Sequence, residues 1–137
     1  MTTPATGLLS NVLVVSEDPG FIVRVQALLR RDGVEVRGCL GPANVPCALK
    51  LEGVCPLAEG ADVVLVDSPR SGSFMYEWAS MPVGNYAERL ARTHPEVSVI
   101  LCGAPEGLSG AVGEVTHVES RAQAVDFLSA LAARAAV

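Results

Sequence analysis

The sequence predicts one α/β domain in which a parallel five-stranded sheet carries helices on both faces, the arrangement called doubly wound. Its 137 residues are the usual length of a single domain. Apolar, β-branched runs of strand length recur along the chain, and segments of helical periodicity lie between several of them. Half of the residues are apolar and 18% are charged, as in folded chains. We expect the domain to span residues 11–137, with residues 1–10 as an N-terminal extension.

Five runs are expected to form the strands: 12–15, 34–39, 63–66, 97–101 and 115–118. The first, third and fourth are nearly continuous in Val, Leu and Ile, which is typical of strands covered on both faces by helices. The second and fifth alternate between apolar and polar residues, which indicates more exposed strands.

Capping residues predict the first and last helices. Asp18 is a suitable N-cap, Pro19 suits the first helical position, and Gly33 is expected to end this helix. Near the end of the chain, Ser120 and Gln123 form a capping box that precedes a second amphipathic segment.

The middle of the chain is less regular. A helix is expected over 83–93, before Pro95, and a short one around 47–51 in a stretch rich in Pro and Gly. Four glycines between residues 103 and 113 predict a shortened fourth helix between the fourth and fifth strands.

Charge and motif content exclude several classes of function. A net charge of −5 and 4% aromatic residues argue against nucleic acid as a partner. The apolar runs are far shorter than the roughly 20 residues of a membrane-spanning helix, and no secretory signal is recognisable, so we expect a cytoplasmic protein. Glycine-rich nucleotide-binding motifs and the G-x-S-x-G elbow are missing, so we expect no enzymatic activity.

Doubly wound sheets bind ligands beyond the carboxyl ends of their strands. The residues expected there are Ser16, Glu17, Asp18, Asp67, Cys102 and Val118. Three of the six carry carboxylates, the side chains that Mg²⁺ prefers in proteins.

Two stretches resemble the receiver domain of two-component response regulators. VLVVSEDP occupies residues 12–19, and ADVVLVD ends the third predicted strand at Asp67. The resemblance covers the chain from Asn11 onward and implies a receiver, or flavodoxin-like, fold. In that family the aspartate ending the third strand accepts a phosphoryl group, and two acids after the first strand hold Mg²⁺. A Thr or Ser after the fourth strand and a Lys after the fifth contact the phosphoryl oxygens.

Carried over position by position, the family's metal site is incomplete in this chain. Asp67 matches the phosphoryl acceptor, but the acidic pair falls on Ser16 and Glu17, so one carboxylate is replaced by a hydroxyl. A slip of one residue would make the pair Glu17 and Asp18. The resemblance implies at most a weak magnesium site formed by Glu17 and Asp67.

The switch positions depart from the family as well. The hydroxyl position falls on Cys102, whose thiol is a poor hydrogen-bond donor, and the lysine position falls near Val118. The only lysine of the chain, Lys50, precedes the third strand, so we expect the pocket to lack its counter-charge.

The sequence therefore predicts a pseudo-receiver. Its expected function is that of a stand-alone regulatory module of the two-component, phosphorelay type that acts through contact with a protein, either a different chain or a second copy. Other interpretations stay open: Asp67 could simply cap a turn, and Glu17 and Asp18 could simply favour a helix N-terminus. The loop with Cys47 and Cys55 could instead bind a small ligand or a metal, or sense redox conditions.

Overall fold

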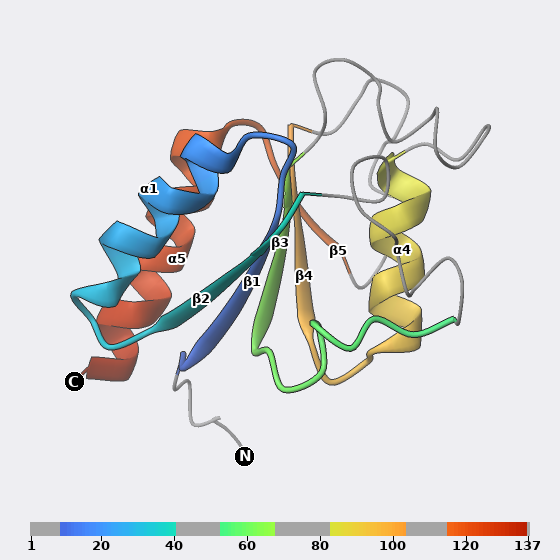
Figure 1. Cartoon of the computed structure of the whole chain (residues 1–137), viewed down its shortest axis with the longest axis horizontal. Coiled ribbons are helices and arrows are strands. Elements are labelled where there is room, and N and C mark those ends of the chain that lie inside the picture. The colour runs from blue at the N-terminus through green and yellow to red at the C-terminus, as the bar shows by residue number, and fades with distance from the viewer. Residues whose placement is uncertain (1–8, 41–52, 68–82, 104–114, 137) are drawn as a thin grey trace.

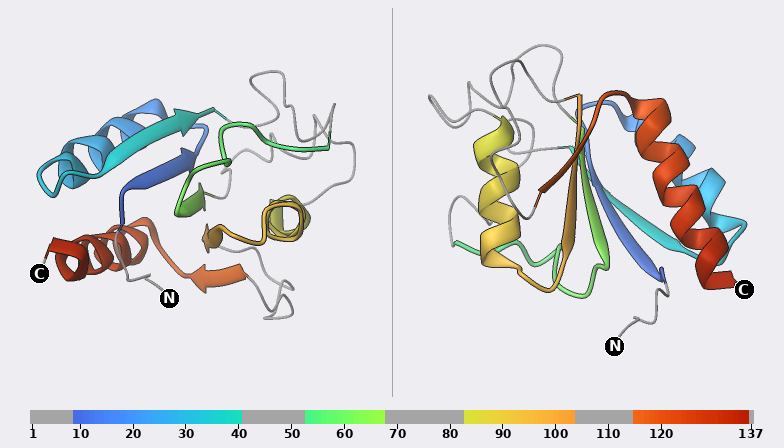
Figure 2. Two further views of the ribbon diagram at one scale, coloured as in Figure 1. Left: turned by 90° about the horizontal axis from the view of Figure 1, so that it is seen from below. Right: turned by 180° about the vertical axis from the view of Figure 1, so that it is seen from behind.

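The computed structural model describes residues 9–40, 53–67, 83–103 and 115–136. Its elements, in chain order, are β1 (Asn11–Val15), α1 (Pro19–Arg30), β2 (Glu35–Cys39), β3 (Val63–Asp67), α4 (Val83–Thr93), β4 (Ser98–Cys102), β5 (Val115–Val118) and α5 (Arg121–Ala136). The strands form one parallel sheet in the order β2-β1-β3-β4-β5. Helices α1 and α5 cover one face, and α4 covers the other (Figures 1 and 2). The predicted doubly wound fold is confirmed.

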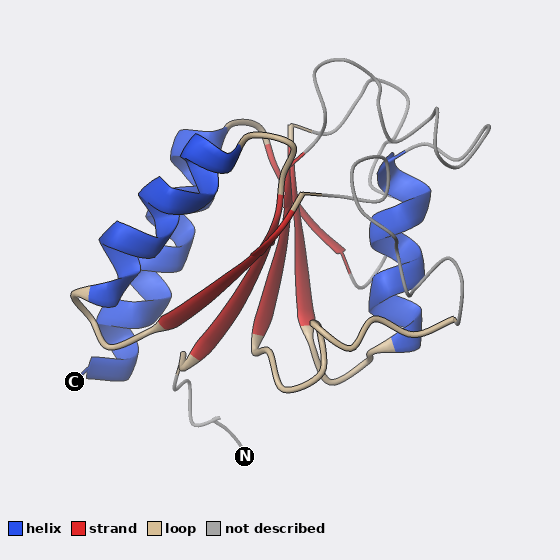
Figure 3. Ribbon diagram, in the orientation of Figure 1, coloured by secondary structure: helices blue, strands red, loops and turns tan. Residues whose placement is uncertain are grey.

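The strand order explains the two kinds of strand pattern in the sequence. Strands β1, β3 and β4 lie inside the sheet, and their residues are almost all buried. Strands β2 and β5 form the two edges of the sheet, whose strands are drawn in red in Figure 3. Their residues are partly exposed. Alternating sequence therefore marks the edges of the sheet, as predicted.

Each face of the sheet has its own apolar core, because successive residues of a strand point to opposite faces. On the α4 side, Leu13 and Val15 of β1 pack with Tyr86 and Leu90 of the helix. The opposite core is built by residues of the inner strands, α1 and α5: Val12, Val14, Leu65, Ile100, Phe21, Leu29 and Leu128. The sheet is thus held from both sides.

Helix α1 begins and ends where the capping residues predicted. The Asp18 carboxylate accepts hydrogen bonds from the backbone N–H of Gly20 at 2.9 Å and of Phe21 at 3.4 Å. Pro19 occupies the start of the helix, where its missing N–H is not needed. Gly33 follows the helix with a φ of 77°, a conformation that residues with a Cβ rarely adopt.

Helix α5 begins at the predicted capping box. Ser120 Oγ accepts a hydrogen bond from Gln123 N at 3.2 Å, and Gln123 Oε1 accepts one from Glu119 N at 2.7 Å. This cap places the first residue of the helix, Arg121, shortly after β5, which ends at Val118.

Some expectations concern parts of the chain outside the described residues: the short helix around 47–51, the shortened fourth helix over 104–113, and Cys47. Leu9, assigned by sequence to the extension, is buried in the core beneath α1 and α5. Among the described segments, no helix combines the length and apolarity needed to cross a bilayer.

Candidate functional site

The parallel register brings the predicted site residues together at one edge of the sheet. Asp67, the last residue of β3, pairs in register with Cys102 at the end of β4. Val66 pairs with Val15, so Ser16 follows β1 directly beside Asp67. Ser16 Oγ donates a hydrogen bond to Asp67 Oδ2 at 2.8 Å, and both side chains are buried. The strand ends therefore form a small polar site at this edge of the sheet.

Arg121 completes this site from α5. Its Nη2 donates to Asp67 Oδ2 at 2.7 Å, and its Nε lies 3.2 Å and 3.3 Å from the two Asp67 oxygens. Its Nη1 donates to Asp18 Oδ2 at 3.0 Å. The guanidinium also lies over the Phe21 ring, 4.6 Å from its centroid. One cation thus joins the end of β3 to the start of α1.

The two helix caps explain how Arg121 reaches both carboxylates. The connections from β1 to α1 and from β5 to α5 lie at the same end of the sheet, where the strands terminate (Figure 1). Asp18 uses Oδ1 to cap α1, which leaves Oδ2 for Arg121. Ser16 Oγ accepts a hydrogen bond from Asp18 N at 3.1 Å, so its own proton is free to point at Asp67.

The ion pairs shift the protonation equilibria toward the charged forms. The hydrogen bond to Asp67 raises the pKa of Arg121, against the opposing effect of burial. The hydrogen bond from Arg121 lowers the pKa of Asp18 below 3.8. Arg121 and Asp18 are therefore fully charged at neutral pH, and their attraction needs no change in protonation.

Cys102 contributes a neutral thiol to the site. Its side chain is buried, and burial together with the negative charge of Asp67 raises its pKa to about 11. A thiol with this pKa is almost entirely protonated near pH 7, so it is a poor nucleophile. This position therefore offers the site neither a hydroxyl nor a thiolate.

The structure corrects one prediction about the site. The pocket was expected to lack a counter-charge because no lysine could follow β5, but Arg121 supplies one. Val118, the position matched to the family's lysine, pairs in register with Cys102 and is only partly buried. The missed signal was the capping box itself, since Ser120 and Gln123 place Arg121 at the end of β5.

Three further predicted residues are Glu17, Cys55 and Cys47. Glu17 is half-buried between Ser16 and Asp18. Cys55 lies apart from the site, and its backbone N–H donates to His94 Nε2 at 3.1 Å. Its partner in the proposed thiol loop, Cys47, lies outside the described residues, so that interpretation stays a prediction.

Magnesium, which the fold family implies, does not fit the donor set beside Arg121. Both Asp67 oxygens and Asp18 Oδ2 face the guanidinium, and Ser16 offers a hydroxyl where a carboxylate is needed. Within the described ranges, no group of three or more His, Cys, Asp or Glu side chains is placed to hold a metal ion. A metal at Glu17 and Asp67 would have to compete with the guanidinium.

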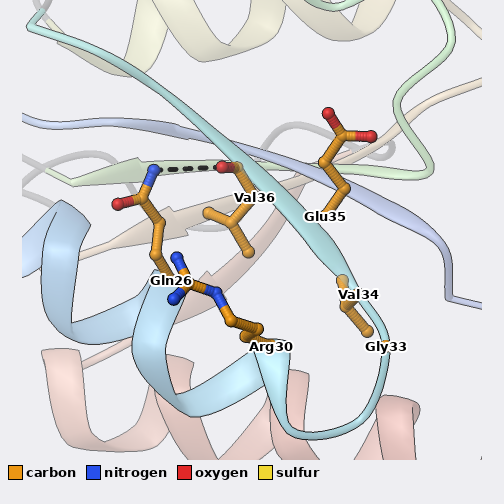
Figure 4. Close-up of a pocket in the computed structure, with 6 residues that line it drawn as sticks. All are labelled: Gln26, Arg30, Gly33, Val34, Glu35 and Val36. Atoms are coloured by element: carbon orange, nitrogen blue, oxygen red, sulfur yellow. Dashed lines mark hydrogen bonds between the residues drawn. The ribbon is translucent and has the colours of Figure 1, made fainter.

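Two hollows that are lined by described residues lie away from this chemistry. One, of about 330 Å³, is lined by the end of α1 and the start of β2 (Figure 4). There Gln26 Nε2 donates a hydrogen bond at 3.1 Å to the backbone carbonyl of Val36, which lies in the edge strand β2. Because this hollow lies at the amino end of the strands, it is no part of the site at Asp67.

Comparisons with solved structures connect this geometry to a known fold. The chain is similar to a response regulator receiver domain protein from Clostridium thermocellum, with 16% identity, a TM-score of 0.53, and coverage of 92% of this chain and 96% of the other. It is similar to the CheY-like protein TadZ from Pseudomonas aeruginosa PAO1, with 16% identity, a TM-score of 0.56 and 94% coverage of each chain. It is also similar to a putative pilus assembly protein, CpaE, from Burkholderia thailandensis, with 21% identity, a TM-score of 0.53, and coverage of 91% and 99%.

The sequence itself matches no protein-family model and no curated protein. The structural similarity nevertheless extends over more than nine-tenths of this chain in each case, and over as much of each neighbour. These neighbours share the parallel α/β architecture and include proteins described as response regulator and CheY-like. The chain therefore has the receiver-domain fold of response regulators.

Proposed function

We propose that this protein is a receiver-like regulatory module of the two-component type that acts through protein–protein contact and is not switched by phosphorylation. The contact between Arg121 and Asp67 carries the proposal. A phosphoryl acceptor needs a carboxylate oxygen free to attack phosphorus, and a cation to neutralise the phosphoryl charge. Here the carboxylate at the acceptor position is already bonded to an internal cation and a hydroxyl.

The network also removes the means of signalling. A receiver switches only if the phosphorylated and free states make different contacts. Arg121 already bonds Asp67 in the free protein, and Cys102 offers no hydroxyl to follow a phosphoryl group. The module would then present one fixed surface to its partner, and it would have no catalytic turnover.

We extend the proposal to a protein that works in the cytoplasm, where a buried thiol such as that of Cys102 stays reduced. Nothing among the described residues favours the alternative of a ligand-binding or redox-sensing loop at Cys55.

Phosphodonor chemistry tests this proposal. The protein is incubated with acetyl phosphate and Mg²⁺, and separately with beryllofluoride and Mg²⁺, beside a receiver domain whose site is complete. We expect no added phosphoryl mass and no change in the amide spectrum of this protein, while the control responds. A phosphoryl group on Asp67, or beryllofluoride-dependent shifts around β3 and α5, would overturn it.

A further inference from the structure

Two carboxylates from different elements converge on one guanidinium. Asp67 ends β3, Asp18 precedes α1, and each bonds a different terminal nitrogen of Arg121. The Asp67 side chain is 7% exposed and that of Arg121 is 22% exposed, so water screens their attraction little. The two carboxylates thus form a cation site, and the cation that fills it is the guanidinium of Arg121.

The guanidinium is fixed by more than these ion pairs. The Phe21 ring lies against it, and the cap of α5 holds its backbone. Nε adds contacts to both Asp67 oxygens, as the fixed, planar donor geometry of a guanidinium allows. These contacts hold Arg121 between the acceptor aspartate and Asp18.

We propose that Arg121 is a permanent internal cation that takes the place of the divalent metal in phosphorylatable receivers and excludes metal from this pocket. The inference deepens the proposed function, because a receiver without metal cannot activate a phosphodonor. Two physical effects underlie it. The guanidinium uses the oxygens that a metal would need, and its charge repels a second cation at close range.

The test is a gain of metal binding. Arg121→Gln removes the charge and shortens the side chain but keeps a polar amide, which frees Asp18 and Asp67 to bind a cation. We expect Mn²⁺, measured by titration calorimetry and by paramagnetic broadening of amide signals near Asp67, to bind this variant at least about tenfold more tightly than the natural protein. Mg²⁺ should compete with it.

Three matched variants define the effect. Arg92→Gln removes an exposed arginine that pairs with Glu88 on α4, and it should not change Mn²⁺ affinity. Arg121→Lys keeps a positive charge and should not gain binding. Arg121→Gln combined with Asp67→Asn should lose the gained affinity, because the metal's buried ligand is removed.

Every outcome decides the inference. A folded Arg121→Gln protein with unchanged Mn²⁺ affinity overturns it, as does tight Mn²⁺ binding at Asp67 in the natural protein. If Arg121→Gln unfolds, recovery of the fold in Mg²⁺ supports the inference, and failure to recover counts against it. Phosphorylation of the natural protein at Asp67 without a bound metal would overturn the proposed function and leave this inference standing.

Discussion

Replacing Arg121 by glutamine should destabilise the protein by about 3 kcal/mol, because it leaves Asp67 charged and buried. Two unit charges about 4 Å apart attract by roughly 4 kcal/mol at an effective dielectric constant of about 20. The shortest nitrogen–oxygen contact is 2.7 Å, and the exposed 22% of the Arg121 side chain reduces the attraction somewhat. The hydrogen bond from Ser16 Oγ remains in the variant and still stabilises the Asp67 carboxylate in part.

A double-mutant cycle in urea at pH 7 separates this contact from other effects of the substitutions. Asp67→Asn, Arg121→Gln and the double variant should give a coupling energy of about 2 kcal/mol, because the double variant leaves no unpaired charge. The exposed pair Glu88 and Arg92, 2.9 Å apart on α4, serves as the matched control. Its coupling should stay below about 0.5 kcal/mol. An equally small coupling between Asp67 and Arg121 would refute the reasoning.

Three further predictions concern the surroundings of the site and the sheet. Cys102 should react with iodoacetamide at pH 8 about 100-fold more slowly in the folded protein than in urea, because its raised pKa of about 11 lowers the thiolate fraction. Equal reaction rates in the folded protein and in urea would contradict the burial of this thiol. Since the folded state keeps the thiol proton to higher pH than the unfolded state, the stability should also fall as pH rises above about 9. The lowered pKa of Asp18 predicts a loss of stability in acid, because its contribution to stability is present at neutral pH and is lost as pH falls below 3.8. Asp18→Asn should therefore make the stability, measured by thermal unfolding, depend less on pH in acid. Gly38→Ala would place a Cβ 2.6 Å from Ile22 Cγ2, so it should lower the free energy of unfolding measured in urea by about 1–3 kcal/mol. Adding Ile22→Ala should recover part of this loss. An unchanged unfolding midpoint would show that β2 and α1 are not packed this closely.

Much of the fold was predictable because its signals are local. Burial on both faces demands continuous apolar strands, and β1 and β3 have that pattern. Helix α1 carries its own start signals in Asp18 and Pro19, and helix α4 occupies the predicted range of 83–93. These features depend on neighbours within a few residues, so the sequence alone is enough to place them.

The site was predictable only in part. Asp67, Ser16 and Cys102 meet as expected, because the carboxyl ends of parallel strands share one edge. Arg121 was missed, because the comparison with the receiver pattern looked for a lysine at a fixed strand end. The cation that is present, Arg121, is instead the first residue of α5, directly after the capping residue Ser120.

The sequence by itself determined the strands, the caps of α1 and α5, and the placement of an aspartate at the end of the central strand. Only the tertiary structure decided the electrostatic state of that aspartate, since its cation lies 54 residues away in the chain. A pattern of apolar residues sets which face of an element is buried, and burial is a property that neighbouring residues share. A buried ion pair instead depends on the distance between two side chains, and that distance is fixed by the packing of β3, α1 and α5 around them.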